Sequence, residues 1–232
     1  MHYDRESMAD KRRRLFEKLV REGYIHSEKV LNAMLHVPRE EFLPEDLRHL
    51  AYEDTPLPIG MGQTISAPHM VALMCEVADL DVGMKVLEVG TGSGYHAAVI
   101  AEIVAPSDRP REKWGHVYSI ERVPELAKRA KENLRRSGYA DRVTVITGDG
   151  SKGYPDAAPY DRIIVTAAAP DMPGPLIEQL KKGGKMVIPI GTRYLQYLYV
   201  VEKDKDGRIK RKPVTSCLFV PLIGEYGWKE WE

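Results

Sequence analysis

The stretch Val86-Leu87-Glu88-Val89-Gly90-Thr91-Gly92-Ser93-Gly94-Tyr95 decides the fold of this chain. A short apolar strand carries an acidic residue near its end, three glycines alternate with small hydroxyl residues, and a helical pattern then begins. Glycine has no Cβ atom, so such a turn brings bare backbone close to a ligand and tolerates positive φ. The spacing is G-x-G-x-G, which differs from the G-x-G-x-x-G turn of dinucleotide-binding proteins. The stretch therefore predicts a strand, turn and helix that face a bound ligand.

Alternating strands and helices follow from residue 84 onward. Short β-branched strands that alternate with helices specify a parallel sheet covered by helices on both faces. We therefore expect an α/β fold with a mostly parallel, doubly wound sheet. The predicted strands are Lys85–Val89, Val117–Ile120, Val143–Thr147, Ile163–Thr166 and Lys185–Ile190, and the predicted helices are Tyr95–Val104, Pro124–Ser137 and Pro173–Lys181.

The two ends of the chain differ from this pattern. After Gly191 the sequence predicts two antiparallel strands, residues 195–203 and 214–221, joined by a hairpin turn. We expect one domain in three parts: a helical cover with a substrate loop (1–80), a cofactor-binding core (81–191), and C-terminal strands with a tail (192–232). The expected cover comprises helices Met8–Glu22, Ser27–Leu35 and Pro68–Ala78, a short broken helix at Arg39–Leu50, and an irregular segment at residues 56–67.

Composition narrows the class of protein. The 232 residues suffice for one well-buried domain, and 34 basic residues balance 34 acidic ones. A net charge of zero offers no general attraction to nucleic acid, and the basic runs at residues 11–14 and 208–212 suit solvated faces. No apolar run approaches the ~20 residues that span a bilayer. The two cysteines lack metal or redox spacing. We expect a cytoplasmic protein that binds no metal, nucleic acid or membrane.

Acidic residues mark the ends of the first three predicted strands, at Glu88, Glu121 and Asp149. Ligands of an open α/β sheet lie outside the carboxyl ends of its strands. A carboxylate at Glu121 can accept both hydroxyls of an adenosine ribose, and Asp149 can accept from an adenine amino group. Carboxylates suit a ligand with a sulfonium and an ammonium group, whereas a dinucleotide needs positive charge nearby. This arrangement predicts S-adenosylmethionine; for Glu121 and Asp149 taken singly, the alternative is turn and cap chemistry.

Four further stretches identify a family. The glycine turn with Glu88 resembles motif I of S-adenosylmethionine-dependent methyltransferases. Together with this turn, the chain resembles the protein-L-isoaspartate (D-aspartate) O-methyltransferase family from about Met8 to its C-terminus, with a lengthened Ala105–Gly115 loop as the visible departure. The stretches that carry the resemblance are Gly62-Gln63-Thr64-Ile65-Ser66-Ala67-Pro68-His69-Met70, Gly148-Asp149-Gly150, Tyr160-Asp161-Arg162-Ile163-Ile164-Val165-Thr166-Ala167-Ala168-Ala169-Pro170 and Phe219-Val220-Pro221-Leu222-Ile223-Gly224.

The resemblance implies a Rossmann-like methyltransferase fold and a protein repair activity. A methyl group would pass from S-adenosylmethionine to the free α-carboxylate of L-isoaspartyl residues in damaged proteins and peptides, which return through a succinimide to normal aspartate. The family's active-site serine falls on Ser66, and Thr64 is expected to help it hold the substrate. The expected cofactor-binding residues are Glu88, Gly90, Thr91, Gly92, Ser93, Gly94, Glu121, Asp149, Gly150 and His69.

Rival functions remain open on the sequence alone. A methyltransferase acting on RNA would use the same cofactor fold, but the fourth strand ends in Thr166-Ala167-Ala168-Ala169-Pro170 and not in a D-P-P-Y or N-P-P-Y motif. A nicotinamide dehydrogenase would need a different glycine spacing. A non-catalytic nucleoside-binding protein would keep the glycines but has no reason to carry Thr64-Ile65-Ser66. A carboxylate with a pKa near ~4 is ionised at pH 7, so the favoured reaction needs no general base.

Overall fold

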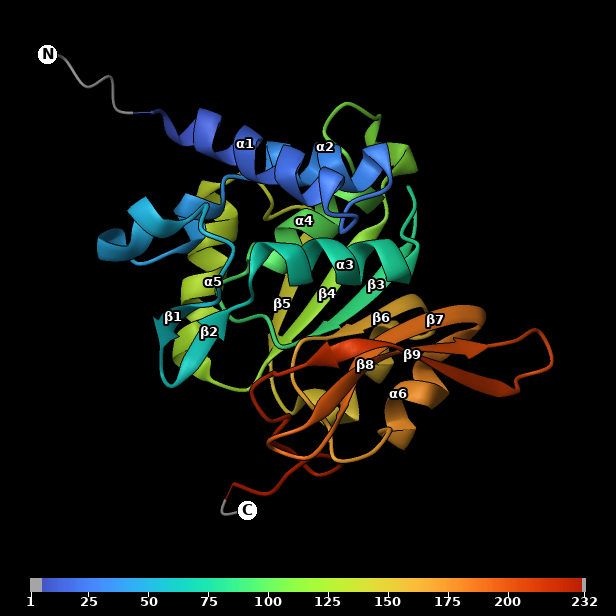
Figure 1. Ribbon diagram of the computed structural model, residues 1–232. Helices are drawn as coiled ribbons and strands as arrows, with labels where there is room; N and C mark the ends of the chain where they lie inside the picture. The colour runs from blue at the N-terminus through green and yellow to red at the C-terminus, as the bar shows by residue number, and fades with distance from the viewer. Residues whose placement is uncertain (1–5, 231–232) are drawn as a thin grey trace, which may run out of the picture.

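The computed structural model describes residues 6–230. A seven-stranded sheet in the order β5-β4-β3-β6-β7-β8-β9 forms its centre (Figure 1). The first five strands in this order are parallel, and β8 and β9 are antiparallel, as the sequence predicts. The strands are β3 Lys85–Val89, β4 His116–Glu121, β5 Val143–Thr147, β6 Tyr160–Val165, β7 Leu180–Gly191, β8 Gln196–Lys203 and β9 Ile209–Cys217.

Strand order reverses around β3. From β3 the chain crosses to β4 and β5 on one side, and then returns to β6 on the other side. All of β3 after its first residue is buried, as expected for a strand covered on both faces. The reversal leaves a crevice outside the carboxyl ends of β3, β4 and β6, which is where ligands of open α/β sheets bind.

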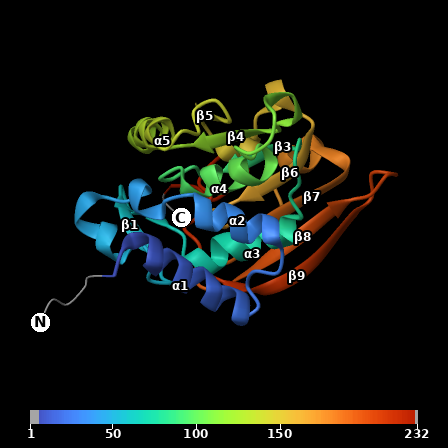
Figure 2. The same cartoon turned by 90° about the horizontal axis from the view of Figure 1, so that it is seen from above.

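Helices form the outer layers. Figure 1 shows α3 and α4 above the sheet, α1 and α2 above these two helices, and α6 below the sheet. Figure 2 views the same helices from above. Every residue of α4 is buried, because α4 lies between the sheet and this outer helical cover. The helices are α1 Met8–Arg21, α2 Glu28–His36, α3 Pro68–Ala78, α4 Tyr95–Val104, α5 Pro124–Arg136 and α6 Gly174–Gln179, with short 3-10 helices at Arg39–Phe42, Glu45–Leu50, Arg111–Lys113, Gly150–Lys152 and Pro155–Ala157.

Residues 56–67 are not irregular, contrary to the sequence prediction. They contain an antiparallel hairpin of β1 Leu57–Gly60 and β2 Gln63–Ile65. Three consecutive residues with positive φ close its turn, Gly60 (89°), Met61 (53°) and Gly62 (69°). The strands are too short, and too interrupted by proline, for the alternation that marks a strand in sequence.

Two other predicted boundaries are wrong. Helix α6 ends at Gln179 and β7 begins at once at Leu180, although the apolar pattern predicts helix to Lys181. Strand β9 begins at Ile209 and ends at Cys217, whereas the sequence predicts residues 214–221. β9 is an edge strand with mostly exposed side chains, so it lacks the alternation of a half-buried strand. Residues 218–221 instead leave the sheet and enter the crevice.

The remaining surface features agree with a globular chain. The Ala105–Gly115 segment is a loop with one 3-10 turn, and the indole Nε1 of Trp114 donates to the Pro106 carbonyl at 3.0 Å. Within residues 6–230, no helix has both the length and the apolar character needed to cross a bilayer. Cys75 is buried, Cys217 is half-buried, and both are free thiols.

Candidate active site

The glycine turn adopts a backbone that only glycine tolerates at Gly90. Its φ is +99°, and a Cβ atom there would lie 2.3 Å from Thr166 Oγ1. The same hydroxyl donates to the Gly90 carbonyl at 2.7 Å, so the end of β6 clamps the turn that follows β3. Gly92 and Gly94 also have positive φ, at +54° and +90°. The turn is therefore shaped by a long-range contact as well as by local sequence.

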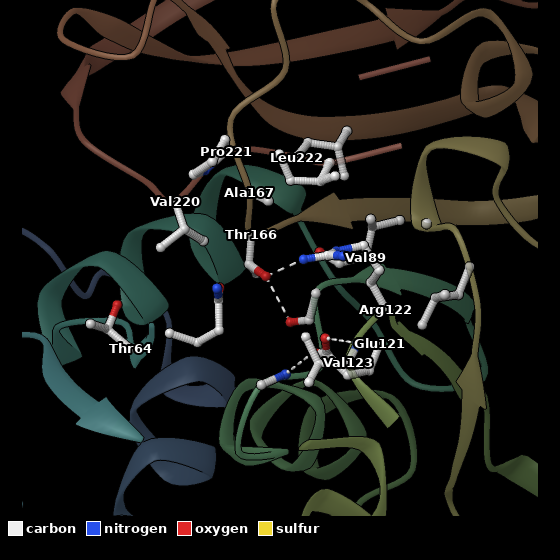
Figure 3. Close-up of a pocket in the computed structure, with 16 residues that line it drawn as sticks. Thr64, Val89, Glu121, Arg122, Val123, Thr166, Ala167, Val220, Pro221 and Leu222 are labelled. Carbon is white, nitrogen blue, oxygen red and sulfur yellow. Dashed lines mark hydrogen bonds between the residues drawn. The ribbon is translucent and has the colours of Figure 1, made fainter. Parts of the chain in front are cut away.

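A cavity opens above this turn, at the ends of β3, β4 and β6 (Figure 3). We call it the cofactor cavity. Its walls are apolar on one side and carry a carboxylate, Glu121, on the other. Its lining has one cationic side chain, Arg122, which forms an ion pair with Glu230 at 2.5 Å. Further lining residues are Gln63, Thr64, Val89, Gly90, Gly92, Ile120, Val123, Gly150, Thr166, Ala167, Val220, Pro221, Leu222 and Ile223.

Glu121 joins β4 to the glycine turn. Its Oε2 accepts from the Gly92 N–H at 2.9 Å, and its Oε1 accepts from the Val123 N–H at the same distance. A carboxylate has about four lone-pair sites. Both oxygens can therefore still accept hydroxyl donors from a ligand in the cavity.

Asp149 does not line the cofactor cavity, although its neighbour Gly150 does. Asp149 Oδ1 accepts from the backbone N–H and hydroxyl of Ser151, at 2.9 and 2.6 Å, and Oδ2 accepts from the Glu225 N–H at 2.8 Å. A Cβ atom at Gly224 would lie 2.0 Å from Oδ1. This carboxylate caps a turn and binds the C-terminal segment, which is the alternative that the sequence leaves open for it.

Glu88 lies beneath the turn and not against the cavity. It is fully buried and accepts a hydrogen bond from the Ser119 hydroxyl, which also contacts Thr91 Oγ1 at 2.6 Å. Burial raises the pKa of Glu88 to about 8, despite the hydrogen bond from Ser119. The sequence predicts that Glu88 binds the cofactor; in the structure its side chain supports Thr91 from below, through Ser119.

His96 extends this buried network. Its Nδ1 lies 3.9 Å from Glu88 Oε1, and its Nε2 lies 3.4 Å from Cys75 Sγ. Burial lowers the pKa of His96 to about 3. The sequence does not predict this network, because a histidine on an apolar helix gives no local signal of its partners.

A second cavity, the acceptor cavity, adjoins the first. His69 and Met70 line it from the first turn of α3, and Ser66 lines it from just before that helix. The other lining residues are Ser216 and Cys217 at the end of β9, Leu218, Phe219 and Val220 after it, and Pro56, Thr64, Ala67 and Thr166. The Ser66 hydroxyl makes no hydrogen bond to any residue of 6–230. The residue before α3 is Ala67, which makes no side-chain cap bond, so Ser66 does not cap this helix.

His69 lies in the acceptor cavity and not in the cofactor cavity. Asp54 Oδ1 accepts from its backbone N–H at 2.9 Å and lies 3.0 Å from its Nδ1. The ring also packs against Tyr24, with 5.1 Å between centroids. Burial raises the pKa of Asp54, but the hydrogen bonds from His69 outweigh it, so the net pKa is lowered.

Three residues line both cavities: Thr64, Thr166 and Val220. Molecules bound in the two cavities would therefore meet at this shared wall. A third, smaller space behind it is lined by Ser66, Thr91, Ser93, Tyr95 and His96 among others. The predicted residues Thr64, Ser66, Thr91 and Ser93 are thus brought together from segments about 25 residues apart in the chain.

The apolar side of the cofactor cavity was missed as a binding surface. Val220, Leu222 and Ile223 line it, and Figure 3 shows Val220 and Leu222 on the side away from Glu121. Apolar residues carry no chemical signature in sequence, and only the family-like tail at residues 219–224 marks this segment. Within residues 6–230, no three His, Cys, Asp or Glu side chains are grouped so that they could hold a metal ion.

Comparison with known proteins identifies the family of this chain. A family model described as Protein-L-isoaspartate(D-aspartate) O-methyltransferase matches residues 10–227. A curated relative from Hyperthermus butylicus, named protein-L-isoaspartate O-methyltransferase, is 76% identical over 229 residues, which cover 99% of this chain and 95% of the relative. One from Methanopyrus kandleri with the same name is 60% identical over 219 residues, which cover 94% of each.

A solved structure supports the same assignment. It comes from Plasmodium falciparum, is described as a protein-L-isoaspartate O-methyltransferase in complex with S-adenosyl-L-homocysteine, and has a TM-score of 0.80 at 32% identity. The match covers 91% of this chain and 98% of the solved one. This chain belongs to the protein-L-isoaspartate(D-aspartate) O-methyltransferase family.

Proposed function

We propose that this protein transfers a methyl group from S-adenosylmethionine to the free α-carboxylate of L-isoaspartyl residues in damaged proteins and peptides. The methyl ester then returns through a succinimide to normal aspartate. One observation carries the proposal: the cofactor and acceptor cavities share a wall at Thr64, Thr166 and Val220. Two bound reactants are held in contact there, and such positioning supplies much of the rate of a two-substrate reaction.

The cofactor cavity fits S-adenosylmethionine. When bound, this cofactor supplies a methyl group on a positively charged sulfur atom. The Glu121 carboxylate is placed to accept ribose hydroxyls, and Val123, Leu222 and Ile223 offer an apolar surface for a base. The one cation in the lining, Arg122, is paired with Glu230, so little positive charge opposes a sulfonium. A Cβ atom at Gly90 would clash with Thr166, so glycine lets the turn pack against the end of β6 at this wall.

The glycine turn is completed by Thr91, Ser93 and Gly94. Glu88 and Asp149 act as positioning residues. Glu88 supports Thr91 through Ser119 from beneath the turn. Asp149 holds the C-terminal segment, whose residues 220–223 close the cavity. Both carboxylates would then act on cofactor binding through other residues.

In the acceptor cavity, Ser66 and His69 are the polar groups proposed to hold the isoaspartyl carboxylate, with Thr64 beside them. The unpartnered Ser66 hydroxyl can donate to a carboxylate oxygen without breaking another bond. No group has to remove a proton, because the substrate carboxylate is already ionised at neutral pH. A hydroxyl orients the nucleophile and leaves its charge available for attack.

The proposed partners are proteins and peptides that contain isoaspartyl residues. We further propose that the enzyme works in the cytoplasm, since two free thiols suit a reducing compartment. The Cys75 thiol is fully buried, and burial raises its pKa, so it is unreactive.

The test is methyl transfer from tritiated S-adenosylmethionine to three acceptors: an isoaspartyl peptide, its aspartyl twin, and bulk tRNA. Base-labile label on the isoaspartyl peptide alone is the expected result. Base-stable label on tRNA would instead identify an RNA methyltransferase. Cofactor binding by calorimetry with no transfer to any acceptor would identify a non-catalytic nucleoside-binding protein.

A further inference from the structure

The chain itself contains two Asp-Gly pairs, Asp149-Gly150 and Asp206-Gly207. An aspartyl residue followed by glycine is prone to isomerise, because the following backbone nitrogen has no neighbouring side chain to hinder its attack on the carboxyl carbon. Whether it does so depends on how firmly the fold holds the carboxylate and the nitrogen. The two pairs differ sharply in this respect.

Asp149 is protected. Both of its oxygens are occupied by hydrogen bonds from Ser151 and Glu225, as described above. Gly150 is buried, and a Cβ atom there would lie 2.4 Å from Val89 Cγ1. The carboxylate cannot rotate towards the next nitrogen without losing these bonds and disturbing the core of the sheet.

Asp206 is unprotected. It lies at the tip of the β8–β9 hairpin, its side chain is 72% exposed, and its one partner is Arg208, at 3.8 Å across an exposed ion pair. The turn is held by Asp204, whose Oδ1 accepts from the Asp206 and Arg208 N–H groups at 2.9 Å. The Gly207 N–H donates to the Asp204 carbonyl at 3.0 Å. One exposed hydrogen bond therefore stands between this nitrogen and the Asp206 carboxyl, and exposed hairpin tips open locally at low cost.

We propose that Asp206 isomerises and then becomes a methylation site for a second copy of this enzyme, an inference that rests on the proposed function. In the first step the Gly207 nitrogen bonds to Asp206 Cγ, and one water is lost from the carboxyl group and the N–H. Water then opens the succinimide at its α-carbonyl, which leaves a β-linked backbone and a free α-carboxylate. An oxygen of that carboxylate bonds to the donor methyl carbon, while the carbon–sulfur bond breaks and its electron pair stays on sulfur. Attack by the Gly207 nitrogen later expels methanol and re-forms the succinimide.

The hairpin tip lies too far from the acceptor cavity of its own molecule to enter it, so the reaction needs a second copy. Cys217, at the end of β9, lines the acceptor cavity, and the hairpin tip precedes Ile209 at the other end of this strand. A rise of about 3.3 Å per residue places the tip roughly 26 Å or more from its own acceptor cavity. Figures 1 and 2 both show the hairpin projecting on the side away from β1 and β2, which carry Thr64. The tip cannot reach its own site but is free to enter another molecule's.

The test uses the full-length enzyme aged in warm neutral buffer and then mixed with fresh enzyme and tritiated S-adenosylmethionine. Digestion after lysine releases residues 206–210 as one peptide. We expect base-labile label on this peptide, at a rate proportional to the concentration of fresh enzyme. Asp206→Glu should lose the label, because its imide ring would need six members, and Asp206→Asn should gain it. Asp206 lines neither the cofactor cavity nor the acceptor cavity.

A synthetic isoaspartyl peptide in the same tube separates this inference from the proposed function. If the synthetic peptide is methylated but the 206–210 peptide is not, the inference is wrong and the function stands. Label that persists in Asp206→Glu, that falls on the peptide containing Asp149, or whose rate is independent of fresh enzyme would also overturn it. If the synthetic peptide itself stays unlabelled, the proposed function fails first.

Discussion

Asp54 holds His69 through a single oxygen atom. Its Oδ1 accepts from the His69 backbone N–H at 2.9 Å and lies 3.0 Å from the ring Nδ1. The first bond fixes the first turn of α3, and the second fixes the ring that faces the acceptor cavity. With a proton on Nδ1 shared with Asp54, the other ring nitrogen, Nε2, remains for a substrate. One carboxylate thus sets both the position and the tautomer of a cavity-lining histidine.

Asp54→Asn should therefore weaken substrate binding without touching the cofactor. The loss of a hydrogen bond to a charged group costs about 1.5–3 kcal/mol, so KM for an isoaspartyl peptide should rise about tenfold or more. Cofactor affinity should be unchanged, because Asp54 does not line the cofactor cavity. The matched control is Asp46→Asn, since Asp46 is exposed and bonds to no other described residue. An unchanged KM with a normal melting temperature would exclude this role.

Ser66→Ala should lower kcat and spare stability. Removing one oriented donor costs roughly 10 to 1,000-fold in kcat, and the hydroxyl has no partner whose loss would destabilise the fold. Cofactor affinity should stay within about threefold, because uniform binding is unaffected. Ser27→Ala is the contrasting control: Ser27 caps α2 through the Val30 N–H at 3.3 Å, so it should lose about 1 kcal/mol of stability with normal turnover. A normal kcat in Ser66→Ala would mean that Ser66 does not orient the substrate carboxylate, and Thr64 would become the candidate for that role.

Glu121→Ala should weaken S-adenosylmethionine binding by roughly 1–3 kcal/mol, the range for hydrogen bonds to a charged group. The variant should also melt at a lower temperature, because the Gly92 and Val123 N–H groups lose their acceptor. Glu121→Gln keeps one acceptor oxygen and should show smaller effects on both. Calorimetric titration and thermal unfolding measure the two quantities. If a folded Glu121→Ala protein kept its full affinity for S-adenosylmethionine, Glu121 would not be a cofactor-binding residue.

Glu88→Gln should change how stability depends on pH. Burial raises the folded-state pKa of Glu88 from its ordinary value of 4.5 to about 8, so the folded protein keeps a proton that the unfolded chain releases. The free energy of unfolding therefore falls as pH rises from 4.5 to 8. The variant lacks this group, so its melting temperature relative to the wild type should rise between pH 5 and pH 8. The low pKa of His96 acts below pH 6.5 and is common to both proteins.

The control for this measurement is Glu17→Gln, an exposed position on α1 with no bond to another described residue. Its melting temperature should follow the wild type at every pH. A constant difference between Glu88→Gln and the wild type from pH 5 to pH 8 would mean that Glu88 is ionised when buried.

Much of the fold follows from neighbouring residues. The glycines after β3 need positive φ, which is a property of single residues, and Ser27 caps a helix within three positions. Periodicity of apolar residues then separates strands from helices and predicts the parallel sheet. These are local signals, so the sequence by itself determines the core of the fold, the glycine turn, Glu121 at the end of β4, and Ser66 before α3.

Contacts between distant segments of the chain decided the surroundings of several site residues and the apolar wall of the cofactor cavity. Asp149 is predicted to bind the cofactor, and only the tertiary structure shows that it also binds a segment some 75 residues further along the chain. Glu88 is predicted to bind the cofactor, and the packing of β4 against β3 sets its side chain beneath the turn, beside Ser119. The apolar wall comes from residues 220–223, and Asp54 reaches His69 across the β1–β2 hairpin. Strand order and the exit of the chain after β9 set these relations, because burial and long-range hydrogen bonds exist only once the sheet has assembled.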